Sequence, residues 1–252
     1  MNLKKSILGL TLAAGLCFAG TANAADLYVS GAASLTNAFE AVKAAFVKKN
    51  PGVNVLTNYA ASNPLLKQMQ EGAPVDVFAS ADQATMDKAQ KDNLIDPATR
   101  KNFALNDLVL IVPSDSKLKI KDVKSLDSAK VKRIAIGNPD SVPAGRYTRD
   151  ALTNAKLWDK LAPKYINSAS VRQALDYVSR GEVDAGFVYR TDALKAGEKV
   201  KIIANVGGHE PVSYPIAVAK TGKNAADGAK FVDFVLSEEG QKILAGFGFS
   251  KP

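Results

Sequence analysis

The sequence predicts an α/β protein, because short apolar runs alternate along the chain with stretches of helical periodicity. The apolar runs predict strands at residues 27–29, 53–56, 75–78, 108–112, 134–136 and 186–188. Between the first two runs, one apolar face at helical spacing is formed by Leu35, Ala38, Phe39, Val42, Ala45 and Phe46. Asn50-Pro51 ends this helical pattern. Such alternation favours mostly parallel sheets flanked by helices.

Further helices are predicted by capping patterns and by the end of the chain. Ser80-x-x-Gln83 and Ser170-x-x-Gln173 are both capping boxes, which predict that helices open at these serines. Residues 226–236 and 237–245 predict two C-terminal helices, which we expect to pack on the first part of the fold.

The order of these elements suggests two lobes. Asn106-Asp107 precedes a strand that can cross to a second lobe, and residues 212–215 can lead the chain back. We therefore assign residues 25–107 plus 215–252 to lobe 1 and residues 108–214 to lobe 2. A two-lobed α/β protein with a cleft has the shape of a ligand binder that closes about a hinge.

Residues 1–24 have the features of a secretory signal peptide. Lys4 and Lys5 precede an uncharged apolar run, residues 7–19, and residues 22–24 (ANA) form a cleavage site. The apolar run is too short to span a bilayer comfortably. We therefore expect an exported mature protein that begins at Ala25 and is soluble after cleavage of the signal.

The only cysteine, Cys17, lies within this signal, and Leu16 before it is not the small residue that a lipid-attachment site requires. Without other cysteines the mature chain has no disulfide, and it is long enough to bury a core without one. The formal net charge is +8, of which two charges belong to the signal. In an exported protein this excess indicates a solvated surface with a mild attraction for anions, and no nucleic-acid partner.

The motifs of common enzyme classes are missing from the sequence. The sole histidine, His209, lies in a loop-like stretch, and with no mature cysteine the common zinc arrangements cannot be built. The chain has neither a G-x-S-x-G elbow nor the glycine-rich phosphate-binding loops. We therefore expect neither enzyme activity nor a cofactor.

Turns rich in small and hydroxyl residues connect predicted strands to predicted helices, at residues 30–36, 59–64, 138–147 and 168–171. Helix N-termini carry unpaired N–H groups and a partial positive charge, so several of them directed at one point can bind an anion without a cationic side chain. We expect Pro64 at the first or second helical position of its turn. The alternative is that each serine only caps its own helix.

Four segments resemble, in the same order, the periplasmic molybdate-binding proteins, the soluble components of molybdate ABC importers. They are residues 31–39 (GAASLTNAF), 72–82 (GAPVDVFASAD), 142–145 (VPAG) and 186–189 (GFVY). The first two are shared with related binding proteins, and the combination with the last two is more specific. The resemblance covers essentially the whole mature chain. It implies a two-lobed periplasmic binding protein of type II that holds an oxyanion in its cleft and delivers it, as a monomer, to a membrane ABC permease.

The resemblance also implies a set of ligand-binding residues. Ser34 and Ser62 would each offer a hydroxyl and a backbone N–H from lobe 1. Ala144 and Val171 would donate backbone N–H groups from lobe 2, and Tyr189 would donate its phenolic hydroxyl. No other metal site is implied. Independently of the resemblance, the strand-to-helix turns place all of these residues except Tyr189 at helix starts.

The sequence departs from the family pattern at two places. Ser62 is flanked by Ala61 and Asn63 where relatives are often serine-rich, and Pro64 has no N–H to offer. Arg146 is charged where an apolar residue can occur, and we expect it to face solvent on its helix. The alternative is that Arg146 reaches the mouth of the cleft and strengthens anion capture.

A site made only of donors suits a dianion that cannot donate, such as molybdate, tungstate or sulfate. Phosphate still carries a proton near neutral pH, and a buried unpaired O–H would cost about 1–3 kcal/mol. Only pocket size separates sulfate from molybdate, so the resemblance alone favours molybdate and tungstate, with sulfate or another tetrahedral oxyanion as the alternative.

Two further hypotheses about function stay open. One is an iron(III) binder that uses Tyr28, Tyr59 and Tyr189, and the second is an exported α/β enzyme.

Overall fold

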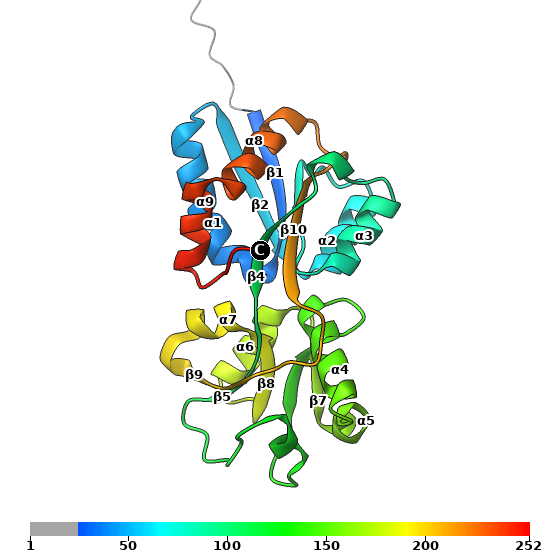
Figure 1. Cartoon of the computed structure of the whole chain (residues 1–252), viewed down its shortest axis with the longest axis vertical. Coiled ribbons are helices and arrows are strands. Elements are labelled where there is room, and N and C mark those ends of the chain that lie inside the picture. Colours follow the sequence, from blue (N-terminus) through cyan, green and yellow to red (C-terminus); the bar gives the residue numbers. More distant parts are fainter. Residues whose placement is uncertain (1–24) are drawn as a thin grey trace, which may run out of the picture.

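The computed structural model describes residues 25–252, so the predicted signal peptide and Cys17 lie outside the described residues. The described chain forms two five-stranded sheets, each flanked by helices, and the two lobes are stacked along the long axis (Figure 1). The predicted α/β fold with two lobes is thereby confirmed. No helix within residues 25–252 has the length and apolar character needed to cross a membrane.

The sheet of lobe 1 is formed from both ends of the described chain. In sheet order its strands are β2 (Val53–Ala60), β1 (Ala25–Ala32), β3 (Val77–Ala79), β10 (Val212–Val218) and β4 (Lys101–Asn106). Its helices are α1 (Thr36–Lys49), α2 (Ser62–Gln70), α3 (Gln83–Lys91), α8 (Ala225–Leu236) and α9 (Glu238–Gly246).

The sheet of lobe 2 repeats this arrangement. In sheet order its strands are β7 (Tyr165–Ser168), β6 (Ile134–Gly137), β8 (Ala185–Tyr189), β5 (Leu108–Pro113) and β9 (Val200–Asn205). Its helices are α4 (Pro143–Asn154), α5 (Trp158–Leu161), α6 (Val171–Ser179) and α7 (Arg190–Ala196). Short 3-10 turns join several of these elements.

Each sheet is mixed, with one strand running against the other four. In lobe 1, β1 is parallel to β2 and β3, and β10 is antiparallel to its neighbours β3 and β4. In lobe 2, β6 is parallel to β7 and β8, and β5 is antiparallel to its neighbours β8 and β9. The reversed strands are those that follow the two passages between lobes. The strands are therefore mostly parallel, as predicted.

The chain passes between the lobes twice, side by side. It leaves lobe 1 at Asp107, between β4 and β5, and returns through residues 206–211, between β9 and β10 (Figure 1). Two adjacent crossings permit the lobes to rotate about a hinge. The exact residue limits of the lobes stay a prediction.

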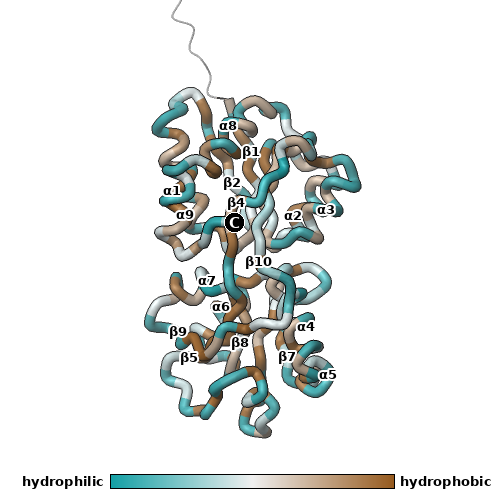
Figure 2. Tube along the Cα trace, in the orientation of Figure 1, coloured by the Kyte–Doolittle hydropathy of each residue, from teal (hydrophilic) through white to brown (hydrophobic). Residues whose placement is uncertain are grey.

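Apolar residues concentrate on the strands of both lobes, and the outer turns and helices are more hydrophilic (Figure 2). In lobe 1 the helices are held by an aromatic cluster in which Phe46 and Phe231 meet edge to face, with ring centroids 5.2 Å apart. Buried Asp76 joins two segments by accepting hydrogen bonds from the backbone N–H groups of Tyr28 and Asn224. Part of the segment 72–82 is therefore needed by the fold itself.

Two of the predicted helix starts are wrong. Helix α3 begins at Gln83, and its cap is Asp82, whose carboxylate accepts the backbone N–H of Thr85 at 3.2 Å. Ser80 instead donates its hydroxyl to Asp82. Pro64 is the third residue of α2, not the first or second. By contrast, Ser170 caps α6 as predicted.

Candidate functional site

The predicted site residues lie at the carboxyl ends of strands that face each other across the cleft. Ser34 and Ser62 follow β1 and β2 in lobe 1. Ala144 and Val171 begin helices after β6 and β7 in lobe 2, and Tyr189 ends β8. Ligands of open α/β sheets bind at this edge of the strands.

All of the predicted residues line one small cavity between the lobes. It is completed by Ala32, Ala33, Ala61, Ala81, Val142 and Pro143. None of these lining residues has a charged side chain. The cavity volume of about 10 Å³ is close to what one water molecule needs. In this state of the cleft the cavity is therefore small and enclosed, and the lobes have to move apart for any larger ligand to enter it.

Ser62 is the first residue of α2 and is fully buried. Its Oγ accepts a hydrogen bond from the backbone N–H of Ala81 at 3.0 Å. Because the oxygen already accepts, its hydroxyl hydrogen is free to point into the cavity. Its backbone N–H belongs to the first turn of a helix and has no acceptor within that helix.

Ser34 lies in the 3-10 turn Ala33–Leu35 and is also buried. Its Oγ is 2.9 Å from the hydroxyl oxygen of Tyr214, which also accepts the side-chain N–H of Asn106 at 3.3 Å. If Tyr214 donates to Ser34, the hydroxyl hydrogen of Ser34 is left for the cavity. Aligned bonds of this kind strengthen one another, so the chain from Asn106 through Tyr214 would make Ser34 a better donor.

The first turn of α6 holds Val171 in the cavity wall. Ser170 caps this helix by accepting the backbone N–H of Gln173 at 3.2 Å, and Val171 is the first helical residue. Since the cap serves Gln173, the N–H of Val171 has no partner in its own helix.

The first turn of α4 holds Ala144 close to the end of β6. Pro143 is the first residue of the helix and Ala144 is the second. A Cβ atom added to Gly145 would lie 2.0 Å from the carbonyl oxygen of Gly137, so only glycine permits this approach. The segment 142–145 therefore combines a proline that starts the helix, a residue that offers its N–H and a glycine that permits close packing.

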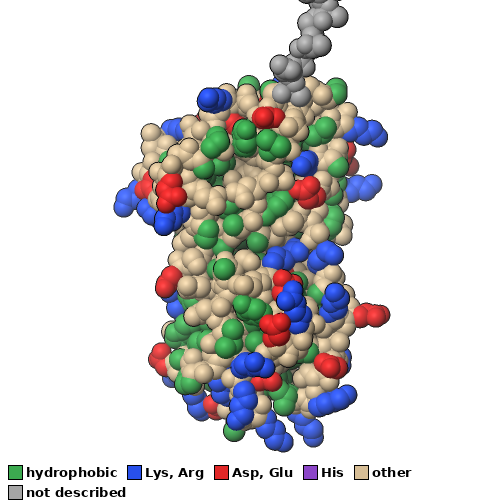
Figure 3. Space-filling model, turned by 180° about the vertical axis from the view of Figure 1, so that it is seen from behind, with side chains coloured by type: hydrophobic (Ala, Val, Ile, Leu, Met, Phe, Trp, Pro, Cys, Tyr) green, Lys and Arg blue, Asp and Glu red, His purple; other side chains and the backbone are tan. Residues whose placement is uncertain are grey.

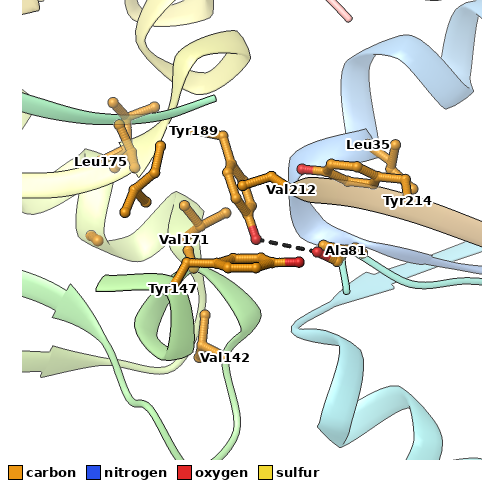
Figure 4. Close-up of a cluster of buried hydrophobic side chains, with 14 of the residues drawn as sticks. Leu35, Ala81, Val142, Tyr147, Val171, Leu175, Tyr189, Val212 and Tyr214 are labelled. Carbon is orange, nitrogen blue, oxygen red and sulfur yellow. Dashed lines mark hydrogen bonds between the residues drawn. The ribbon is translucent and has the colours of Figure 1, made fainter. Parts of the chain in front are cut away.

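Tyr189 extends from lobe 2 toward lobe 1 and is 1% exposed. Its hydroxyl donates to the carbonyl oxygen of Ala81 at 3.5 Å, a long hydrogen bond that a better acceptor can replace. Burial raises the pKa of Tyr189 well above its ordinary value, so the hydroxyl keeps its proton and acts as a donor. Figure 4 shows the hydroxyls of Tyr189 and Tyr147 directed toward lobe 1, where Ala81 lies.

Arg172, next to Val171, connects several elements around the cavity. Its Nε contacts the carboxylate of Asp192 at 2.5 Å, and Asp192 also accepts the backbone N–H of Tyr189. Across the cleft, Arg172 donates to Asn37 Oδ1 at 2.7 Å and to the carbonyl oxygen of Ser34 at 3.3 Å. Burial raises the pKa of Asp192, and the neighbouring Arg172 opposes this rise. No motif marks Arg172 in the sequence, so its role is visible only in the structure.

The prediction that Arg146 faces solvent is wrong. Its guanidinium crosses the cleft, and its Nε donates to Asp82 Oδ2 at 2.8 Å. Its Nη2 also donates to Thr85 at 2.9 Å and to Asn63 at 3.2 Å. The reason is geometric: α4 begins at the cleft, so a long side chain in its first turn can reach the facing lobe.

The structure does not bring the three tyrosines of the iron hypothesis together. Tyr189 lines the cavity, whereas the Tyr59 hydroxyl donates to Glu40 at 3.0 Å and Tyr28 lies on β1. Within residues 25–252 there is no cluster of three or more His, Cys, Asp or Glu side chains that could hold a metal ion. His209 contacts the carbonyl oxygens of Val206 and Glu210 in the second crossing.

The charged residues of the surface are of mixed sign. On the face shown in Figure 3, Lys and Arg side chains lie over both lobes, with Asp and Glu side chains among them. This distribution matches the solvated surface that the sequence predicts.

Comparison with known proteins places the chain in a family. Residues 27–250 match the model of the bacterial extracellular solute-binding proteins. The chain is 38% identical over 244 residues to the molybdate-binding protein ModA of Haemophilus influenzae, and the alignment covers 95% of each chain. It is 39% identical to ModA of Escherichia coli, over 96% of this chain and 97% of the relative.

Solved structures agree with this comparison. The periplasmic molybdate-binding protein of Azotobacter vinelandii superimposes with a TM-score of 0.80 at 26% identity, over 90% of this chain and 99% of that one. The match extends over both lobes and therefore includes the cleft on which the predicted residues lie. The chain belongs to the family of bacterial extracellular solute-binding proteins.

Proposed function

We propose that the protein is the substrate-binding component of an ABC importer, that it binds molybdate and tungstate in the cavity between its lobes, and that it delivers them to a membrane permease. The mature protein acts in the periplasm as a monomer, without enzyme activity or a cofactor. The relatives named as molybdate-binding proteins and the family of extracellular solute-binding proteins support this proposal.

The observation that carries the proposal is the composition of the cavity wall. Ser34, Ser62 and Tyr189 provide hydroxyl groups, and the first turns that contain Ala144 and Val171 provide backbone N–H groups. Each of these groups can donate to an oxyanion, and no carboxylate lines the cavity to accept a proton from one. Such a wall favours a fully deprotonated dianion and disfavours phosphate, whose proton would find no carboxylate to accept it.

A ligand panel tests this proposal. We expect molybdate and tungstate to raise the melting temperature strongly, sulfate to raise it far less, and phosphate and ferric citrate to leave it unchanged. A ligand at 1,000 times its dissociation constant adds about 4 kcal/mol of stability. Equal shifts with sulfate and molybdate at one concentration would favour the alternative, a general binder of tetrahedral oxyanions.

Substitution of Tyr189 tests one donor of the site. Tyr189→Phe removes a hydroxyl whose partner within the protein is the distant carbonyl of Ala81, so the folded protein should lose little stability. A hydrogen bond to a charged acceptor contributes about 1.5–3 kcal/mol, so molybdate affinity should fall about tenfold to over a hundredfold. Tyr147→Phe is the matched control, because Tyr147 is a neighbouring buried tyrosine that does not line the cavity. Calorimetry that gives the same affinity for Tyr189→Phe and the unmodified protein would make Tyr189 a core residue only.

A further inference from the structure

An ion pair crosses the cleft beside the cavity. Arg146 lies in the first turn of α4, two residues after Ala144, and Asp82 lies in lobe 1, next to Ala81. The two side chains are 18% and 6% exposed, so the pair is mostly withdrawn from solvent. It therefore joins the walls of the cavity from opposite lobes.

The carboxylate of Asp82 is prepared for this contact by its own lobe. One oxygen, Oδ1, accepts the backbone N–H of Thr85 and the hydroxyl of Ser80, and these bonds fix its orientation at the start of α3. The other oxygen, Oδ2, accepts both Nε and Nη2 of Arg146. Because the first set of bonds lies within lobe 1, it persists when the lobes separate, and the contact with Arg146 does not.

Neighbouring polar groups complete this cross-cleft contact. Asn63, the residue after Ser62, accepts from Arg146 at 3.2 Å and donates from Nδ2 to the carbonyl oxygen of Asp140 at 3.0 Å. Thr85 accepts from Arg146 and donates to Asn63. The bonds of Asn63 to Arg146 and to Asp140 thus tie the start of α4 to the start of α2, and these two bonds join opposite lobes, so they break when the cleft opens.

We propose that Arg146 and Asp82 form a latch that determines how long the closed protein retains its oxyanion. This inference rests on the proposed function. Arg146 does not line the cavity, and its positive charge is engaged by Asp82, so it acts as a positioning residue. It holds the first turn of α4, which contains Ala144, against the residues of lobe 1 beside Ser62 and Ala81. Breaking the latch makes opening easier and leaves the donors themselves unchanged.

Dissociation kinetics test the latch. Arg146→Gln removes the guanidinium, and Asp82→Asn removes the charge but keeps an acceptor that can cap α3. Loss of one member of a buried charge pair acts mainly on dissociation, so each substitution should raise the molybdate dissociation rate about tenfold or more, and change the association rate much less. In the double variant the increase should be smaller than the product of the single increases, because the two residues act through one contact.

Arg149→Gln is the matched control. Arg149 lies on the same helix, its side chain is 41% exposed, and it pairs with its neighbour Asp150 within lobe 2. The Arg149→Gln variant should release molybdate at the same rate as the unmodified protein. The latch is overturned if both single variants release molybdate at the unmodified rate, or if their effects multiply independently in the double variant.

Scattering separates failure of the latch from failure of the proposed function. If the unmodified protein binds no oxyanion of the panel, the proposed function is wrong. The latch is then tested by small-angle scattering of the ligand-free proteins. The radius of gyration should be larger for Arg146→Gln and Asp82→Asn than for Arg149→Gln. Equal dimensions for all three variants in that experiment would overturn the latch as well.

Discussion

Replacing Arg172 by glutamine should destabilise the folded protein by about 3–5 kcal/mol, because the buried carboxylate of Asp192 loses its cationic partner. The Asp192 side chain is 0% exposed, so water cannot replace the guanidinium. Urea denaturation at neutral pH measures the loss. Arg180→Gln is the matched control, since Arg180 ends the same helix with a side chain that is 68% exposed, and its substitution should change stability by less than about 0.5 kcal/mol.

The pH dependence of this loss identifies its cause. Burial raises the pKa of Asp192 in the folded protein, so the folded chain binds a proton at this site more tightly than the unfolded chain does. Stability from this group is therefore greatest below the unfolded pKa of about 3.9 and declines as the pH rises through the folded pKa. Without Arg172 the pKa of Asp192 in the folded protein rises further. The loss of stability in Arg172→Gln should consequently shrink as the pH is lowered.

A second substitution separates the charge from the other contacts of Arg172. Asp192→Asn in the Arg172→Gln background removes the unpaired carboxylate, so the double variant should recover much of the stability at neutral pH. A deficit that is independent of pH, or that the double variant does not reduce, would show that the loss comes from the contacts with Asn37 and Ser34 instead of the carboxylate.

The parts of the fold that could be predicted from sequence are those that depend on local patterns. Helix α9 begins within one residue of its predicted start because Ser237 caps it by accepting the N–H of Gly240. The apolar run at residues 108–112 corresponds to β5, which is buried along its whole length. By contrast, β9 has exposed and partly exposed residues, and no apolar run marks it.

The missed parts of the site depend on contacts between distant segments. Tyr214 is 180 residues from Ser34, and its bond to the Ser34 hydroxyl exists because β10 returns to lobe 1 beside β3 and β4. Arg146 and Arg172 reach partners in the other lobe, and their roles depend on how the lobes face each other. The reach of a side chain across a cleft leaves no periodicity or spacing in the sequence. Arg172 and Tyr214 could therefore be found only in the structure, and for Arg146 the sequence offered the cleft mouth only as the less favoured alternative.

Replacing Val171 by proline should abolish most oxyanion binding and leave α6 intact. Val171 is the first residue of the helix, where proline is favoured because its fixed φ suits the helix and its missing N–H has no helical partner. Ser170 is extended, with φ −157° and ψ 163°, a conformation that a residue before proline can adopt. Proline therefore deletes one backbone donor from the cavity wall, which a side-chain substitution cannot do.

The expected loss of affinity is about a hundredfold or more. A hydrogen bond to a charged acceptor contributes about 1.5–3 kcal/mol, and the Cδ atom of the proline ring would also occupy the position in which the N–H pointed. Val171→Ala is the control, because it removes the side-chain methyl groups and keeps the N–H. Calorimetry with molybdate compares the two variants, and circular dichroism checks that α6 still forms. If Val171→Pro and Val171→Ala bind molybdate equally well, the N–H of Val171 does not contact the ion, and the first turn of α6 has to be removed from the site.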